Sequence, residues 1–140
     1  FLSLFENVQG RGSLLGFCVM GGIFSEGIDL KEDRLIGVVI VGTGLPMVCT
    51  EQELLKGYFE KTNQKGFDYA YQYPGMNKVM QAAGRVIRTM EDEGIILLLD
   101  DRFLKREYQE LFPREWWPHQ IVNRGNVGKA IRDFWKERKR

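Results

Sequence analysis

The sequence lacks the cysteine and histidine clusters that mark metal-binding and disulfide-rich proteins. Its 140 residues include only two cysteines, Cys18 and Cys49, and one histidine. The cysteines are far apart and form no Cys-x-x-Cys pair, which argues against a zinc site and against a disulfide scaffold. Because both lie in or next to apolar runs, we expect buried free thiols in a reducing compartment. The expected location is the cytoplasm, or the nucleoid or nucleus for a protein that acts there.

Long apolar runs are also missing. No run approaches the roughly 20 residues needed to cross a bilayer, and no signal peptide is recognisable, so we expect no membrane partner. The hydrophobic content of 44% and charged content of 28% are ordinary for a soluble globular protein. We expect a single domain over residues 1–140, in which residues 113–140 form a C-terminal connection and a basic helix. The chain begins with Phe, which suggests a fragment of a longer protein.

The small net charge of +1 conceals a basic C-terminal end. Residues 124–140 are rich in Lys and Arg, and only Asp133 and Glu137 oppose them. A basic end can attract phosphate backbones. A solvated helix face followed by a frayed tail explains the same residues, and charge alone favours this second interpretation.

Three short apolar runs predict strands, at residues 14–20, 35–41 and 94–100. Their hydrophobicity is nearly continuous, which is typical of strands covered on both faces. Helical patterns lie between and after them, at residues 50–66 with Thr50 as N-cap, 74–90 with Pro74 in the first turn, 101–112 ending before Pro113, and 126–138. The alternation of strands and helices predicts an α/β domain with a mostly parallel sheet.

The predicted helix 74–90 has two different sides. Its apolar side consists of Met76, Val79, Met80, Ala83, Ile87 and Met90. The opposite side consists of Lys78, Gln81, Gly84, Arg85 and Arg88. A glycine inside a helix costs about 1 kcal/mol relative to alanine, and here it stands beside two cations. Two guanidinium groups beside an amide suit phosphate oxygens, although a solvent-exposed basic face explains the same spacing.

Two glycine-containing stretches resemble phosphate-binding loops but fail the test. GNVGK at 125–129 has Asn123 and Ala130 where a P-loop needs Gly and Ser or Thr. GRGSLLG at 10–16 precedes its predicted strand, whereas a dinucleotide-binding fingerprint follows one. We reject both.

Two further polar features receive structural interpretations. His119 has no neighbouring acid or nucleophile, so we assign it no catalytic role. Asp100 and Asp101 follow the third predicted strand and are expected to cap the next helix instead of holding a metal ion. No metal site is expected in this chain.

A loop and a helix together carry a resemblance to a known family. GGIFSEGIDL at 21–30 follows the first predicted strand, at the strand end where α/β sheets place ligands. With QAAGRVIR at 81–88 it resembles motifs V and VI of superfamily 2 helicases. The longer stretch resembles the XPD/DinG group of ATP-dependent DNA helicases over roughly residues 14–112. The positions that match this group, in motif VI and in the segment after it, are Gln81, Gly84, Arg85, Ile87, Arg88, Asp92, Gly94, Asp100, Arg102 and Phe103.

The resemblance implies a RecA-like fold, the second of two motor domains, truncated at its N-terminus. ATP with Mg²⁺ would be bound mainly by the first motor domain of the same protein. By position, Arg85 and Arg88 would be arginine fingers that reach the γ-phosphate, and Gln81 would contact the same region. Such cations stabilise the charge that spreads during phosphoryl transfer.

The resemblance also implies binding residues for nucleotide and for single-stranded DNA. Gly27, Asp29 and Gly84 would line the nucleotide, with Asp29 on the ribose or orienting an arginine. Backbone amides and a hydroxyl suit contact with phosphates of any sequence. The DNA-binding positions would be Gly22, Phe24 and Ser25.

Several features of the family are missing from this chain. It has no Walker A or acidic Walker B motif, and it lacks the cysteines that hold an iron–sulfur cluster in the first half of many members. The GTG turn at 42–44 is longer than the family pattern. We therefore expect an ATP-dependent DNA helicase in the full protein and an inactive isolated chain. The alternatives are a non-catalytic nucleic-acid-binding module with a helicase-like fold and a nucleotide-dependent protein-interaction domain.

Overall fold

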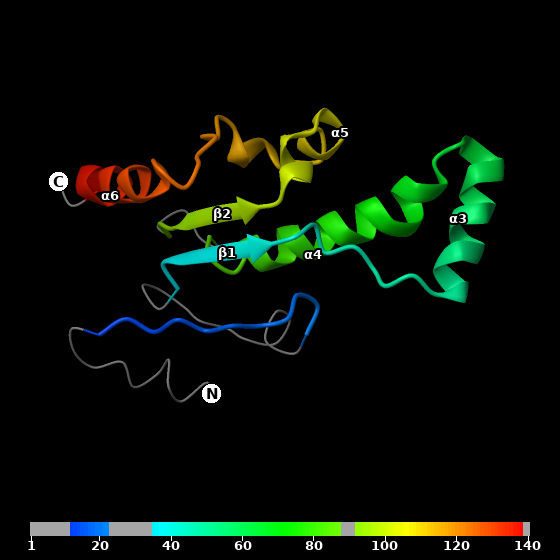
Figure 1. Ribbon diagram of the computed structural model, residues 1–140, viewed down its shortest axis with the longest axis horizontal. Coiled ribbons are helices and arrows are strands. Elements are labelled where there is room, and N and C mark those ends of the chain that lie inside the picture. The colour runs from blue at the N-terminus through cyan, green and yellow to red at the C-terminus, as the bar shows by residue number, and fades with distance from the viewer. Residues whose placement is uncertain (1–11, 23–34, 88–91, 139–140) are drawn as a thin grey trace. The chain divides into compact units, whose positions relative to one another are not determined.

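The computed structural model describes residues 12–22, 35–87 and 92–138 (Figure 1). The chain divides into two compact units, Phe1–Gln109 and Glu110–Arg140. The first contains β1 (Gly37–Val41), α3 (Thr50–Asn63), the π-helical turn η2 (Asp68–Gln72), α4 (Tyr73–Ala83), β2 (Ile95–Leu99), the 3₁₀ helix η3 (Asp101–Leu104) and α5 (Arg106–Gln109). The second contains the 3₁₀ helix η4 (Arg114–Trp116) and α6 (Val127–Arg138). No helix in the described ranges is long and apolar enough to span a bilayer.

The two strands form a parallel pair. Val39 lies opposite Leu97, and Val41 lies opposite Leu99. Both strands fall within predicted apolar runs, and the helices between them supply the crossover that a parallel pair requires. The predicted α/β fold with a parallel sheet flanked by helices is confirmed, and it is consistent with a RecA-like domain.

Only one face of β1 is well covered within the described residues. Side chains alternate between the faces of a strand, and Ile40 is buried while Val39 and Val41 are 55% and 71% exposed. Helix α4 packs against β1, and Figure 1 shows it running alongside the strands. The prediction of cover on both faces is therefore wrong for β1 within the described residues, whereas residues 95–98 of β2 are partly buried on both faces. A continuous apolar run favours double coverage but does not supply the second covering element.

The predicted strand 14–20 is also wrong. Residues 12–19 form neither helix nor strand, and the described part of the sheet contains only β1 and β2. Without a pairing partner the segment is not buried, and Phe17 is 89% exposed. Cys18 is accordingly an exposed free thiol, and Cys49 is only partly buried, so the expectation of two buried thiols is wrong as well.

The helix predicted at 50–66 is present but differs at both ends. Thr50 is the first helical residue, and Cys49 occupies the N-cap position without a side-chain capping bond. At the other end the helix stops at Asn63, because Gln64 adopts a left-handed conformation with φ of 58°. Gln64 thus takes the terminating role expected of Gly66.

The helix predicted at 101–112 is broken into two short pieces. Lys105 is extended, with ψ of 140°, and separates η3 from α5. The predicted cap is confirmed for Asp100, whose carboxylate accepts a hydrogen bond of 2.9 Å from the backbone N–H of Arg102. The final helix is confirmed as α6.

Helix α4 ends earlier than predicted. Its last residue is Ala83, and Gly84 is the C-capping residue, whose N–H donates to the Met80 carbonyl at 2.8 Å. The next two N–H groups, of Arg85 and Val86, bond three residues back, at 3.3 Å and 3.0 Å. Such bonds satisfy the last carbonyls of a helix. Gly84 is therefore not inside a helix, and the expected cost of about 1 kcal/mol does not arise.

The early end of α4 also changes which side chains face the core. Met76, Val79 and Ala83 are buried as predicted. After Ala83 the chain turns more tightly than an α-helix, so Val86 is buried and Ile87 is 41% exposed. The sequence pattern, which assumes a continuous helix, predicts Ile87 for the core, and this prediction is wrong.

Candidate functional site

The end of α4 brings three of the predicted site residues together. Gln81 and Gly84 are exposed, and Arg85 is partly exposed in the turn that follows the helix. An amide and a guanidinium at one helix end can hydrogen-bond phosphate oxygens. The C-terminal end of a helix carries partial negative charge, so binding of an anion here would depend on the charge of arginine and not on the helix dipole. Arg88, the second predicted arginine finger, lies outside the described residues.

The start of the predicted DNA-binding loop lies beside the same helix. A turn closes at Gly22, whose N–H donates to the Val19 carbonyl at 3.0 Å. A Cβ on Gly21 would lie 3.5 Å from Cδ and Cε of Lys78 on α4. Lys78 is three residues before Gln81, hence on the adjacent turn of the helix. The structure thus places the Gly21–Gly22 turn against the helix that carries Gln81.

Four other predicted site residues cannot be placed. Phe24, Ser25, Gly27 and Asp29 lie outside the described residues. The sequence pattern assigns Lys78 only to the polar side of its helix and predicts no role for it. Its position one turn before Gln81 is the available signal that it could take part in the site.

The GTG turn lies at the carboxyl end of β1, where α/β sheets place ligands. Gly42 and Gly44 have positive φ angles of 84° and 64°, and the Gly42 N–H donates to the Leu99 carbonyl at 3.1 Å. A Cβ on Gly44 would lie 2.8 Å from the carbonyl oxygen of Gly75 in α4. Both the backbone conformation and the close approach require glycine at position 44. The turn thereby fixes the beginning of α4 against the end of β1.

The π-helical turn η2 ties the beginning of α4 to two other helices. The Tyr71 hydroxyl donates to Glu53 Oε1 on α3 at 2.6 Å, and Gln72 Nε2 donates to the Glu107 carbonyl on α5 at 3.0 Å. The bond to Glu53 raises the pKa of Tyr71 to about 12, and the same bond lowers the pKa of the Glu53 carboxyl. Both Tyr71 and Gln72 are buried. Helix α4 is thus held at its beginning by neighbours on two elements.

Comparison with known proteins identifies the family. Residues 1–120 match the family described as Helicase C-terminal domain. The chain belongs to this family. The match includes both motif stretches and ends before α6.

Relatives of this helicase C-terminal domain are similar over most of its length. It is 30% identical to "Regulator of telomere elongation helicase 1 homolog" of Caenorhabditis elegans, over 93% of this chain and 14% of that protein. It is 32% identical to "ATP-dependent DNA helicase chl1" of Schizosaccharomyces pombe, over 92% of this chain and 16% of that protein. It is 31% identical to "General transcription and DNA repair factor IIH helicase subunit XPD" of the same yeast, over 84% of this chain and 15% of that protein. The chain spans less than a fifth of the length of these relatives.

The polar groups that follow β2 in the helicase C-terminal domain serve a structural purpose. Arg102 Nε and Nη2 donate to the two carboxylate oxygens of Asp100 at 2.8 Å and 2.7 Å. These bonds lower the pKa of Asp100 to about 2 and raise the pKa of Arg102. The Asp100 carboxylate, a possible metal ligand, instead accepts the capping hydrogen bond from the Arg102 N–H and forms an ion pair with the Arg102 guanidinium. Among residues 12–22, 35–87 and 92–138, no group of three or more His, Cys, Asp or Glu residues could hold a metal ion.

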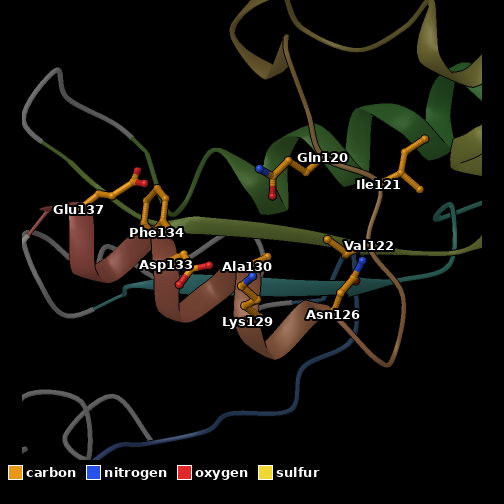
Figure 2. Close-up of a pocket in the computed structure, with 9 residues that line it drawn as sticks. All are labelled: Gln120, Ile121, Val122, Asn126, Lys129, Ala130, Asp133, Phe134 and Glu137. Carbon is orange, nitrogen blue, oxygen red and sulfur yellow. The ribbon is translucent and has the colours of Figure 1, made fainter.

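The second unit contains an aromatic connection and a hollow. The ring of Phe112 lies 5.2 Å from Trp116 and 5.7 Å from His119, so the connection contains an aromatic cluster. The hollow, of about 480 Å³, lies between α6 and the segment before it (Figure 2). Its charged lining mixes Lys129 with Asp133 and Glu137, and such a mixture does not favour phosphate. The lining consists of Gln120, Ile121, Val122, Asn126, Lys129, Ala130, Asp133, Phe134 and Glu137.

Proposed function

We propose that this chain is the second motor domain of an ATP-dependent DNA helicase. In the full protein it would couple ATP hydrolysis to translocation on DNA and to unwinding. The family match over residues 1–120 is the observation that carries the proposal. The exposed Gln81 and Gly84 beside Arg85 support it, because these residues can be reached by a ligand from another domain.

In this proposal Arg85 and Arg88 stabilise the transition state of phosphoryl transfer. ATP with Mg²⁺ would be held mainly by the first motor domain, with its γ-phosphate facing the end of α4. Negative charge spreads over the γ-phosphoryl oxygens during the reaction, and a positioned guanidinium is worth about 10³–10⁵ in rate. Gln81 would contact the same phosphate. An isolated chain without the first motor domain would be inactive.

The remaining predicted residues would bind nucleotide and DNA. Gly27, Asp29 and Gly84 would line the nucleotide, and Gly22, Phe24 and Ser25 would contact single-stranded DNA. Contacts of this kind go to the DNA backbone and read no sequence. Any iron–sulfur cluster of the full protein would be held outside these 140 residues. A helicase of this kind would act on DNA in the nucleus or nucleoid.

The test is Arg85→Ala in the full-length protein. We expect kcat for DNA-stimulated ATP hydrolysis to fall by about 10³ or more, because the finger acts on the transition state. Binding of single-stranded DNA should be retained. Lys61→Ala, in the last turn of the exposed helix α3, removes one positive charge outside the proposed site and serves as the matched control.

Three results would contradict the motor function. Intact ATPase activity with lost DNA binding in Arg85→Ala would support the nucleic-acid-binding module. A wild-type protein that neither binds nor unwinds DNA would support the protein-interaction domain. ATP hydrolysis by the isolated chain that does not depend on Arg85 would contradict the assignment of the chain as a second motor domain.

A further inference from the structure

We propose that Val86 and Gly94 are positioning residues that hold Arg85 in place for catalysis. The inference rests on the proposed function of Arg85 as an arginine finger. Val86 follows Arg85 directly in the chain, and Gly94 immediately precedes β2. Neither residue contacts a reacting group in this proposal, and both act through Arg85.

The contact between the two residues leaves no room for a side chain at position 94. Val86 is only 4% exposed. A Cβ on Gly94 would overlap Cγ1 of Val86, and it would also lie 3.1 Å from the carbonyl oxygen of Ile36. The space that a larger residue would need at position 94 is thus filled by the Val86 side chain.

The Val86 side chain fixes the backbone where the helix no longer does. Helix α4 ends at Ala83, and the Arg85 N–H makes a bond of 3.3 Å to the Ala82 carbonyl, longer than the bonds of its neighbours Gly84 and Val86. The insertion of Val86 against Gly94 therefore adds a restraint beside Arg85. Val86 and Arg85 are joined by one peptide bond, which holds their Cα atoms about 3.8 Å apart. A shift of the Val86 backbone therefore also moves the Arg85 backbone.

The surface that receives Val86 is itself fixed by the sheet. The N–H of Ile95, next to Gly94, donates to the Ile36 carbonyl at 3.1 Å, and Ile95 pairs with Gly37 of β1. Gly94 is therefore held at the beginning of a hydrogen-bonded strand pair. Displacement caused by an added side chain should fall on the turn that carries Arg85 and not on the sheet.

The first measurement is Gly94→Ala in the full-length protein. We expect kcat for ATP hydrolysis to fall by about tenfold to a hundredfold, because a misplacement of about 1 Å can cost a hundredfold in rate. The KM for ATP should change by less than about threefold, since the first motor domain holds most of the nucleotide. Gly37→Ala is the matched control, because its Cβ would lie 3.2 Å from the Ile95 carbonyl in the same strand pair and meets no Val86 atom. We expect the control to retain the wild-type kcat.

Two double variants test whether the effect passes through Val86 and Arg85. Adding Val86→Ala to Gly94→Ala removes the overlapping methyl, so kcat should recover to the level of Val86→Ala alone. Adding Gly94→Ala to Arg85→Ala should cause no further loss, because the arginine is already gone. If Gly94→Ala acted instead through a general effect on folding, it would lower kcat both in the otherwise wild-type protein and in Arg85→Ala.

The outcomes separate this inference from the proposed function. Loss of activity in Arg85→Ala with full activity in folded Gly94→Ala would overturn the inference and leave the proposed function standing. Full activity in Arg85→Ala would overturn the proposed function first. A double variant no better than Gly94→Ala would also overturn the inference.

If Gly94→Ala does not fold, Val86→Ala alone tests whether these residues position Arg85. It should lower kcat by about threefold to tenfold, because it loosens the restraint beside Arg85. Wild-type kcat in this folded variant would overturn the inference.

Discussion

Helices α3 and α4 follow one another in the chain but are held in opposite ways. Helix α4 buries Gly75, Met76, Val79 and Ala83 and packs against β1. Helix α3 has no buried residue, and its Leu54 is 70% exposed. Figure 1 shows α3 beyond the N-terminal end of α4, away from the strands.

Within the described residues, α3 is attached through side chains to η2 and to the segment before it, where Glu60 accepts a hydrogen bond of 2.9 Å from the Gly66 N–H. Tyr71 donates its hydroxyl proton to Glu53, and the ring of Tyr69 stacks on Phe59 with centroids 4.4 Å apart. The helix that leads to the proposed catalytic arginine is therefore fixed by the core, and its neighbour is fixed by a few side-chain contacts. This difference predicts that core changes in α4 reach Arg85, whereas surface changes in α3 do not.

The largest effect should come from Met76→Ala in α4. Truncation of a fully buried methionine costs about 2–5 kcal/mol, because buried contacts are lost and a cavity is left. Hydrogen exchange of the α4 amides in the full-length protein would measure the loss. Leu54→Ala on α3 is the matched control and should cost far less. Equal losses in the two variants would break the comparison.

A smaller effect is expected from Tyr71→Phe, which removes the hydrogen bond between η2 and α3. Exchange of the α3 amides should become faster while that of the α4 amides changes little. The pKa of Tyr71 is raised from 10.0 to about 12 in the folded protein. The stabilisation by its hydroxyl is therefore complete below pH 10 and lost between about pH 10 and 12.

The pH dependence that comes from Glu53, the acceptor in the same hydrogen bond, has the opposite sign. The pKa of Glu53 is lowered from 4.5, so its contribution is complete above that pH and is lost as the pH falls below it. The difference in α3 amide exchange between wild type and Tyr71→Phe should thus be greatest between pH 4.5 and pH 10.0. A difference that does not vary with pH would show that the Tyr71–Glu53 bond contributes nothing to the attachment of α3.

The smallest effect should come from Leu54→Gln on α3. An exposed side chain has little apolar surface to lose from the core, so the free energy of unfolding should change by no more than about 0.5 kcal/mol. Gln also keeps the helix propensity of the position nearly unchanged. Denaturant unfolding of the full-length protein would measure it, and a loss comparable to that of Met76→Ala would contradict the exposed position of this face.

The local pattern predicted the elements whose character is set within a few residues. The apolar runs at 35–41 and 94–100 became β1 and β2, and the final helical pattern became α6. Asp100 caps η3 as expected, because a carboxylate two residues before an N–H can reach it without help from the rest of the fold.

The predictions that failed depended on partners distant in the sequence. Residues 14–20 have the composition of a strand, but a strand also needs a neighbour, and neither β1 nor β2 pairs with this segment. The periodicity after Ala83 favoured Ile87 for the core, and the structure buries Val86 instead. In each case the apolar pattern indicates that side chains favour burial, but it does not indicate which part of the fold will cover them.

The sequence by itself determined the family, the order of β1, α3, α4 and β2, and the spacing of Gln81, Gly84 and Arg85, since these depend on residue identity and local pattern. Only the tertiary structure decided that α4 ends at Ala83 and that Gly84 begins a turn. After Ala83 the N–H groups of Arg85 and Val86 bond three residues back, and Val86 packs into the space that Gly94, ten positions after Gly84, leaves at the beginning of β2. The glycine that looked costly inside a helix is a helix end, and the position of Arg85 follows from the packing of the residue next to it.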